Sequence, residues 1–150
     1  MQPSSHENPL TSSLLTPMLA LIVWSLVMLV WMYATRIPAI QRAGISPSNA
    51  REPTALDALP LAVRQVAHNY NHLMEQPTIF YALVVYSYLA GQQNTPNLIL
   101  AWIYVAIRVV HSLVQATANV VLVRFSLFML GSLTLAILAG RDVWALFSPT

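Results

Sequence analysis

A tract of 20 residues without a charge, residues 14–33, most limits what this chain can fold into. As an α-helix it would extend about 30 Å, which matches the hydrocarbon core of a bilayer. Only 8% of the 150 residues are charged, far fewer than the roughly 25% of a soluble domain. A cleaved signal peptide is a poor alternative, because no basic residue precedes the tract and Tyr33 to Arg36 is a poor cleavage site. The sequence therefore predicts an integral membrane protein.

Further apolar tracts follow, so we expect one all-α domain with four membrane-spanning helices. The predicted spans are residues 14–35, 61–90, 97–117 and 120–139. Residues 1–13 should form a loose tail, and the proline-containing segment 36–60 should be a loop with at most short helical turns. Pro77 should kink the second span near Leu73, because proline cannot donate a backbone hydrogen bond.

The arginines indicate how the helices are oriented. The first loop contains Arg36, Arg42 and Arg51, the third connection precedes Arg124, and the second loop has no basic residue. The positive-inside rule then places the first and third loops in the cytoplasm and both termini outside. The net charge of +2 arises from few charges in total. We therefore expect the membrane, and no nucleic acid, as a partner.

Two of the expected spans carry polar stripes at helical spacing. The first stripe is Arg64, His68, Asn71 and Glu75, and the second is Tyr104, Arg108, His111, Gln115 and Asn119. Residues at these steps share one face of a helix. Charged groups are costly in lipid and usually face a bundle interior or a water-filled cavity. If the stripes face one another, they form a polar cavity that attracts anions.

Structural roles and a metal site are the alternatives for these side chains. A histidine in a membrane helix commonly bonds to a neighbouring helix, and Arg64 and Arg124 can extend to the interface. His68 and His72 are four residues apart and can bind Zn²⁺ with Glu75 as a third donor. However, this is not the metalloprotease spacing, and no acid orients the imidazoles. The chain has no cysteine, which excludes thiolate ligands. We expect no metal site.

Three segments resemble the bacterial branch of the MAPEG family, the membrane-associated proteins in eicosanoid and glutathione metabolism. They are AHNYNHLMEQPTIFYAL at 67–83, AWIYVAIRVVHSLV at 101–114, and RIPA with RAG at 36–39 and 42–44. The resemblance extends over nearly all of the chain after residue 14. It implies a bundle of four transmembrane helices in each protomer and a homotrimer with sites between neighbouring protomers. It also implies a location in the bacterial inner membrane.

The resemblance further implies a glutathione site. Arg64 and either Asn71 or His72 would hold the peptide. Glu75 would bind its ammonium group or pair with an arginine. Arg124 would lie beside the sulfur as the catalytic residue, because a nearby cation favours the thiolate over the thiol. The remaining residues expected at the site are Arg36, which would reach the carboxylates, and His68, Arg108, His111 and Gln115.

Two classes of function follow from the sequence. The first is a membrane glutathione-dependent transferase or peroxidase that acts on lipophilic electrophiles. The second is a non-catalytic membrane protein of the same fold that binds a lipid or presents it to a partner. Arg124 and the polar stripes favour the enzyme. Gln115 and Phe125, which replace a usual tyrosine and serine, favour the second class.

Overall fold

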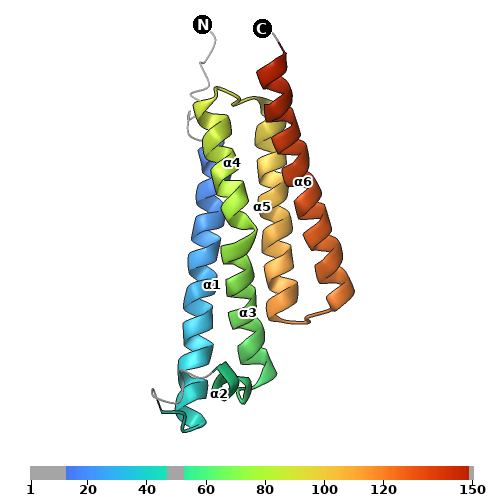
Figure 1. The fold of residues 1–150 in the computed structure, drawn as a ribbon. Coiled ribbons are helices and arrows are strands. Elements are labelled where there is room, and N and C mark those ends of the chain that lie inside the picture. Colours follow the sequence, from blue (N-terminus) through green and yellow to red (C-terminus); the bar gives the residue numbers. More distant parts are fainter. Residues whose placement is uncertain (1–12, 47–52, 149–150) are drawn as a thin grey trace, which may run out of the picture.

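The computed structural model describes residues 13–46 and 53–148, and over these ranges all regular structure is helical (Figure 1). The helices are α1 (Leu15–Arg42), α2 (Pro53–Asp57), α3 (Leu61–Glu75), α4 (Pro77–Leu89), α5 (Thr95–Ala116) and α6 (Val121–Phe147). Helices α1, α5 and α6 are long and apolar enough to cross a membrane. Most of the expected tail and part of the first loop fall outside the described residues.

The second predicted span is divided into α3 and α4 at Gln76 rather than forming one helix. Pro77 is the first residue of α4 and cannot donate a backbone hydrogen bond. The Ile79 N–H donates to the Gln76 carbonyl at 3.1 Å, and the Thr78 hydroxyl donates to the Glu75 carbonyl at 2.6 Å. We expected one helix kinked near Leu73, whereas the structure has two helices separated at Gln76, directly before Pro77.

Two helices extend beyond their predicted ends. Helix α1 continues through Pro38 to Arg42, where we expected a loop from residue 36, and Gly44 follows it at a φ of 64°. One proline removes only one backbone bond, while a positive φ ends a helix and suits glycine. Helix α6 continues to Phe147, where we expected a tail from Gly140. The last turns of α6 are held by Asp142, which accepts hydrogen bonds from α4 and α5.

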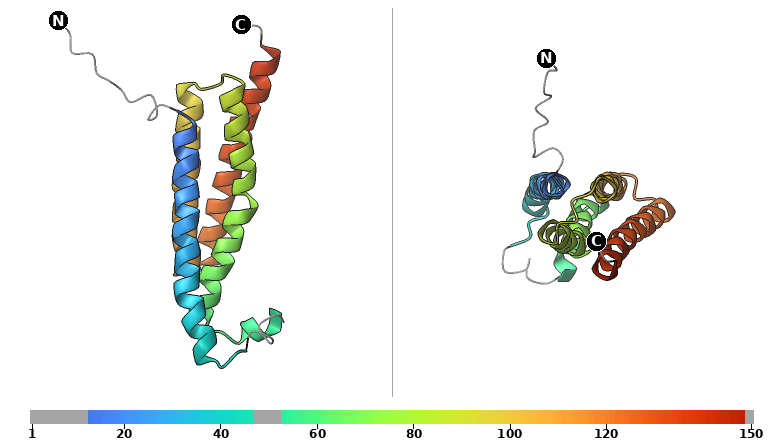
Figure 2. Two further views of the ribbon diagram at one scale, coloured as in Figure 1. Left: turned by 90° about the vertical axis from the view of Figure 1, so that its left-hand side faces the viewer. Right: turned by 90° about the horizontal axis from the view of Figure 1, so that it is seen from above.

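The long helices run alternately up and down the bundle, with α3 and α4 forming one of the rods (Figure 1). The start of α1, the α4–α5 connection and the end of α6 lie at one end. Helix α2, the end of α1 and the α5–α6 connection lie toward the other end, which therefore carries Arg36, Arg42 and Arg124. Seen from above, α6 is inclined to the other helices (Figure 2). The arrangement agrees with the predicted alternation of the connections, while the orientation across the membrane stays a prediction.

Apolar side chains form two buried clusters along the bundle. One joins α1, α4, α5 and α6 and includes Leu21, Phe80, Val84 and Leu135. The other joins α1, α3 and α5 and includes Met28 and Leu73. Outside these clusters, α6 exposes many large apolar side chains: Val121, Leu122, Phe125, Leu133, Trp144 and Phe147. Such a surface fits lipid or a neighbouring protein better than water.

Candidate functional site

Two cavities adjoin at the arginine-rich end of the bundle. The first, which we call the α2 cavity, has a volume of about 220 Å³ and is lined by residues that include Arg36, Asp57, Arg64, His68 and Asn71. The second, the α6 cavity, has a volume of about 240 Å³ and is lined by His68, Asn71, His72, Glu75, Gln115 and Arg124. His68 and Asn71 line both cavities. All the predicted site residues except Arg108 and His111 therefore lie at one or the other.

The α2 cavity contains two arginines and one acid. Helix α1 supplies Arg36, α2 supplies Asp57, and α3 supplies Arg64. Arg64 Nη1 lies 3.7 Å from Asp57 Oδ1, but both side chains are partly exposed, and such a pair contributes little to stability. Arg64 Nε is buried and has no hydrogen-bond partner in the structure. The excess of arginine favours an anionic ligand here.

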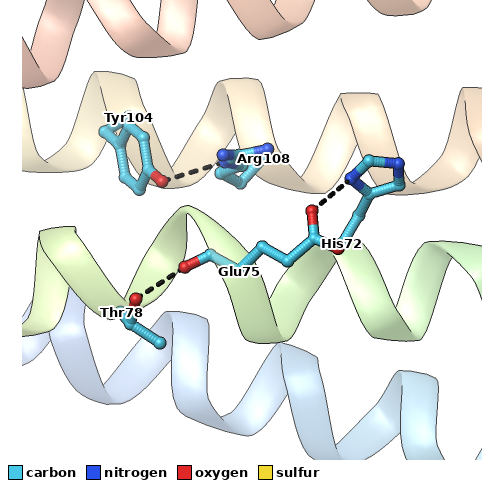
Figure 3. A network of polar contacts seen from close by, with 5 residues as sticks. All are labelled: His72, Glu75, Thr78, Tyr104 and Arg108. Atoms are coloured by element: carbon cyan, nitrogen blue, oxygen red, sulfur yellow. Dashed lines mark hydrogen bonds and ion pairs between the residues drawn. The ribbon is translucent and has the colours of Figure 1, made fainter.

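The α6 cavity combines charged groups of both signs. His72 Nδ1 lies 3.1 Å from Glu75 Oε2 (Figure 3), and Arg124 Nη1 donates to Asn119 Oδ1. Two residues that line this cavity each have a buried atom without a partner in the structure, the donor Nε of Arg124 and the acceptor Oε1 of Gln115. Buried polar atoms are normally hydrogen-bonded. A ligand with both donors and acceptors, such as a peptide, would suit this wall.

Arg108 lies within the bundle and does not line either cavity. It is 2% exposed, and its Nε donates to the Tyr104 hydroxyl at 2.9 Å (Figure 3). Its guanidinium carbon lies 5.3 Å and 5.7 Å from the ring centroids of Tyr104 and Phe128, close enough for cation–π attraction. Among residues 13–46 and 53–148, no acid pairs with Arg108, and its Nη2 is buried without a partner. A buried cation of this kind favours a nearby anion.

The two polar stripes face one another only in part. The α5 stripe is turned inward, since Tyr104, Arg108, His111 and Gln115 are all buried. In the α3 stripe, by contrast, His68, Asn71 and Glu75 are exposed on the single protomer. The contact between the helices is made by His72, whose ring lies edge-on to that of His111 with 6.3 Å between centroids. His68, Asn71 and Glu75 nevertheless line the α6 cavity together with Gln115 of α5, so the two stripes meet at this cavity.

In the described part of the chain, no three His, Asp or Glu side chains lie close enough together to hold a metal ion. His72 uses Nδ1 to contact Glu75. His68 and His72 both line the α6 cavity.

Several buried polar residues were not predicted. Asn69 is fully buried, and neither atom of its side-chain amide has a partner in the structure. At the opposite end of the bundle, Asp142 accepts hydrogen bonds from Ser87 Oγ at 2.5 Å and Asn97 Nδ2 at 3.1 Å. A further cavity of about 570 Å³ lies there, lined by residues that include Arg141 and Trp144. The sequence held one signal for this cluster: Asp142 is the only acid after Glu75.

Comparisons with known proteins agree with the resemblance seen in the sequence. Neither the curated proteins nor the solved structures include a match to this chain. The sequence model of the MAPEG family, however, matches residues 14–144, a range that contains α1 to α5 and all but the last three residues of α6. With its three long apolar helices, this all-α chain is a multi-pass integral membrane protein, and it belongs to the MAPEG family of glutathione-related membrane enzymes.

Proposed function

We propose that this protein is a membrane glutathione-dependent transferase or peroxidase that acts on lipophilic electrophiles. The observation that carries the proposal is the composition of the α6 cavity. Arg124 lines it together with Glu75, Asn71 and Gln115. Glutathione carries two carboxylates, one ammonium group, two amides and a thiol. The cavity therefore offers a partner for the ammonium group, partners for the amides, and a cation for the thiol.

The two adjoining cavities suggest how glutathione lies in the site. An extended tripeptide spans about 10 Å, so it can reach from one cavity to the other past His68 and Asn71, which line both. Arg36 and Arg64 at the α2 cavity would bind a carboxylate, since arginine holds carboxylates through two parallel hydrogen bonds. The thiol would then lie in the α6 cavity beside Arg124. Arg108 and His111 are buried inside the bundle and line neither cavity, so they would support His72 from the interior.

Arg124 has the properties needed to favour a thiolate. An arginine stays protonated even when partly buried, and a cation next to a thiol lowers the pKa of that thiol from its usual value of about 8.5. Glutathione would supply the nucleophilic sulfur: its thiolate would bond to an electrophilic carbon and displace the leaving group there, or would take one oxygen from a hydroperoxide. The second reaction releases an alcohol and leaves a sulfenic acid, which a second glutathione reduces to form the disulfide and water. Leu122 and Phe125, within two residues of Arg124 in the sequence, are exposed apolar side chains. They would let a lipophilic substrate approach from the membrane.

The proposed assembly is a homotrimer in which α3 and α4 together make the fourth crossing. These two helices cover residues 61–89 and extend about 43 Å if collinear. His68, Asn71 and Glu75 are exposed on one protomer, and polar groups at membrane depth favour burial against protein. The resemblance adds the number of protomers and the bacterial inner membrane as location, and the arginine-rich connections predict a glutathione site that faces the cytoplasm. A monomer in mild detergent that still binds glutathione would contradict the trimer.

A non-catalytic lipid-binding protein is the second candidate. Gln115 lies in the cavity wall where a tyrosine is usual, and it offers no hydroxyl to a sulfur. The apolar surface of α6 also suits a lipid.

Thermal unfolding of the detergent-purified protein separates the two candidates. Millimolar glutathione should raise the unfolding temperature of the enzyme, since a ligand at 100 times its Kd stabilises by about 2.7 kcal/mol. S-Methylglutathione serves as the control for peptide binding without a thiol. Stabilisation by lipid, with none by either peptide, would support the non-catalytic protein.

A further inference from the structure

The connection between α5 and α6 contains an asparagine with an unusual backbone conformation. Asn119 has a φ of 50°, and within the described ranges no other residue except glycine has a positive φ. Its N–H donates to the Val114 carbonyl at 2.7 Å, which fixes this conformation at the end of α5. Asparagine, aspartate and glycine are the residues that adopt it most readily.

The side chain of Asn119 holds Arg124. Arg124 Nη1 donates to Asn119 Oδ1 at 2.5 Å, and both residues are half-buried. Arginine only donates hydrogen bonds, so the asparagine atom that faces it must be the oxygen. The bond joins the connection to the first turn of α6. Without it, the long side chain of Arg124 would be free to extend toward lipid headgroups.

The bond engages one nitrogen of the Arg124 guanidinium. Arg124 Nη1 is occupied by Asn119, whereas the buried Nε has no partner in the structure, and the residue lines the α6 cavity. A guanidinium that is already oriented loses less rotamer freedom when it binds. The amide of Asn119 is neutral, so it orients Arg124 without cancelling its charge.

We propose that Asn119 is a positioning residue, which holds the Arg124 guanidinium in the α6 cavity so that it can stabilise an anionic sulfur. This inference rests on the proposed function and adds to it a residue outside the predicted glutathione-binding set. Asn119 itself does not need to touch the ligand.

Two substitutions separate positioning from a purely structural role. Asn119→Gly keeps the backbone conformation and removes the bond to Arg124. Asn119→Asp keeps both the conformation and an acceptor oxygen, but its carboxylate neutralises the positive charge of Arg124. Ser126→Ala is the control, because this hydroxyl lies on the first turns of α6, is exposed, and bonds only to the Leu122 carbonyl.

The test follows the ultraviolet absorbance of the thiolate as the pH of a glutathione-saturated sample is raised, with glutathione affinity and thermal unfolding measured in parallel. We expect N119G and N119D each to reduce the thiolate fraction at neutral pH several-fold, with affinity changed by less than about threefold, and S126A to match wild type. A titration of N119G that matches wild type overturns the positioning role. A wild-type protein that forms no thiolate overturns the proposed function itself, and the inference with it.

Discussion

Arg108 and Tyr104 form a buried hydrogen bond across one turn of α5, with 2.9 Å between the guanidinium Nε and the phenolic oxygen. Both side chains are almost completely buried. Within the described ranges, no carboxylate neutralises the cation. The hydroxyl and ring of Tyr104 and the ring of Phe128 are therefore the groups that stabilise the cation. The pair should be sensitive to substitution for this reason.

Tyr104→Phe removes the acceptor of Arg108 Nε and leaves a second buried donor without a partner, in addition to Nη2. We expect the free energy of unfolding to fall by about 1–3 kcal/mol. Thermal or denaturant unfolding in mild detergent measures this. Tyr88→Phe is the matched control, since Tyr88 is exposed and its loss should change little. Equal stability of the two variants would show that the Arg108–Tyr104 bond contributes nothing.

Arg64→Gln tests the proposed carboxylate site in the α2 cavity. A charge-assisted hydrogen bond contributes about 1.5–3 kcal/mol, so glutathione affinity should fall about 10- to 100-fold. The pH titration of the bound thiol should stay unchanged, because Arg64 does not line the α6 cavity. Arg42→Gln is the control: Arg42 lines a separate cavity with Pro38 and Pro60. Calorimetric titration that finds the same affinity for R64Q, R42Q and wild type would exclude this role.

The polar cluster at the opposite end of the bundle should matter for stability and not for glutathione. Asp142→Ala removes the acceptor for Ser87 and Asn97, so it should lower the free energy of unfolding by about 1–3 kcal/mol. Glutathione affinity of the folded protein should not change. The exposed acid Asp57 provides the comparison through Asp57→Ala, which should be nearly neutral for stability. A D142A protein as stable as D57A would contradict this assignment.

Labelling of single cysteines tests the predicted orientation, since the natural chain has no cysteine. Ala43 follows α1 and Ala90 follows α4, and both are exposed. An impermeant thiol reagent applied outside the cell should label Ala90→Cys, and Ala43→Cys should react only after the membrane is opened. Labelling of both from the same side would rule out the topology.

The sequence predicted the inward face of α5 well, because polar residues at helical spacing in an apolar tract have few places to lie. Tyr104, Arg108, His111 and Gln115 are buried as a set. Asn119 continues the same spacing, yet it lies in the connection beyond Ala116. The helix already ends at Ala116, where the Thr117 backbone leaves helical values, so periodicity alone does not place Asn119 in the connection.

The cluster around Asp142 could not be predicted from local pattern. Its hydrogen-bond partners are 55 and 45 residues away in the sequence. Gly140, Arg141 and Asp142 therefore resembled the end of a span, when they lie within α6 and Asp142 is buried. The period of the α3 stripe predicts one shared face, but not that most of this face is exposed on a single protomer.

The central claim is that Arg124 stabilises a glutathione thiolate, and the ultraviolet absorbance of the thiolate tests it most directly. Wild-type protein mixed with glutathione at neutral pH should gain this absorbance. Arg124→Ala should lose it, because removal of the cation raises the pKa of the bound thiol toward its usual value of about 8.5. Turnover should fall with it, while glutathione affinity changes much less. An R124A protein with the thiolate absorbance of wild type, or a wild type without any, would contradict the account.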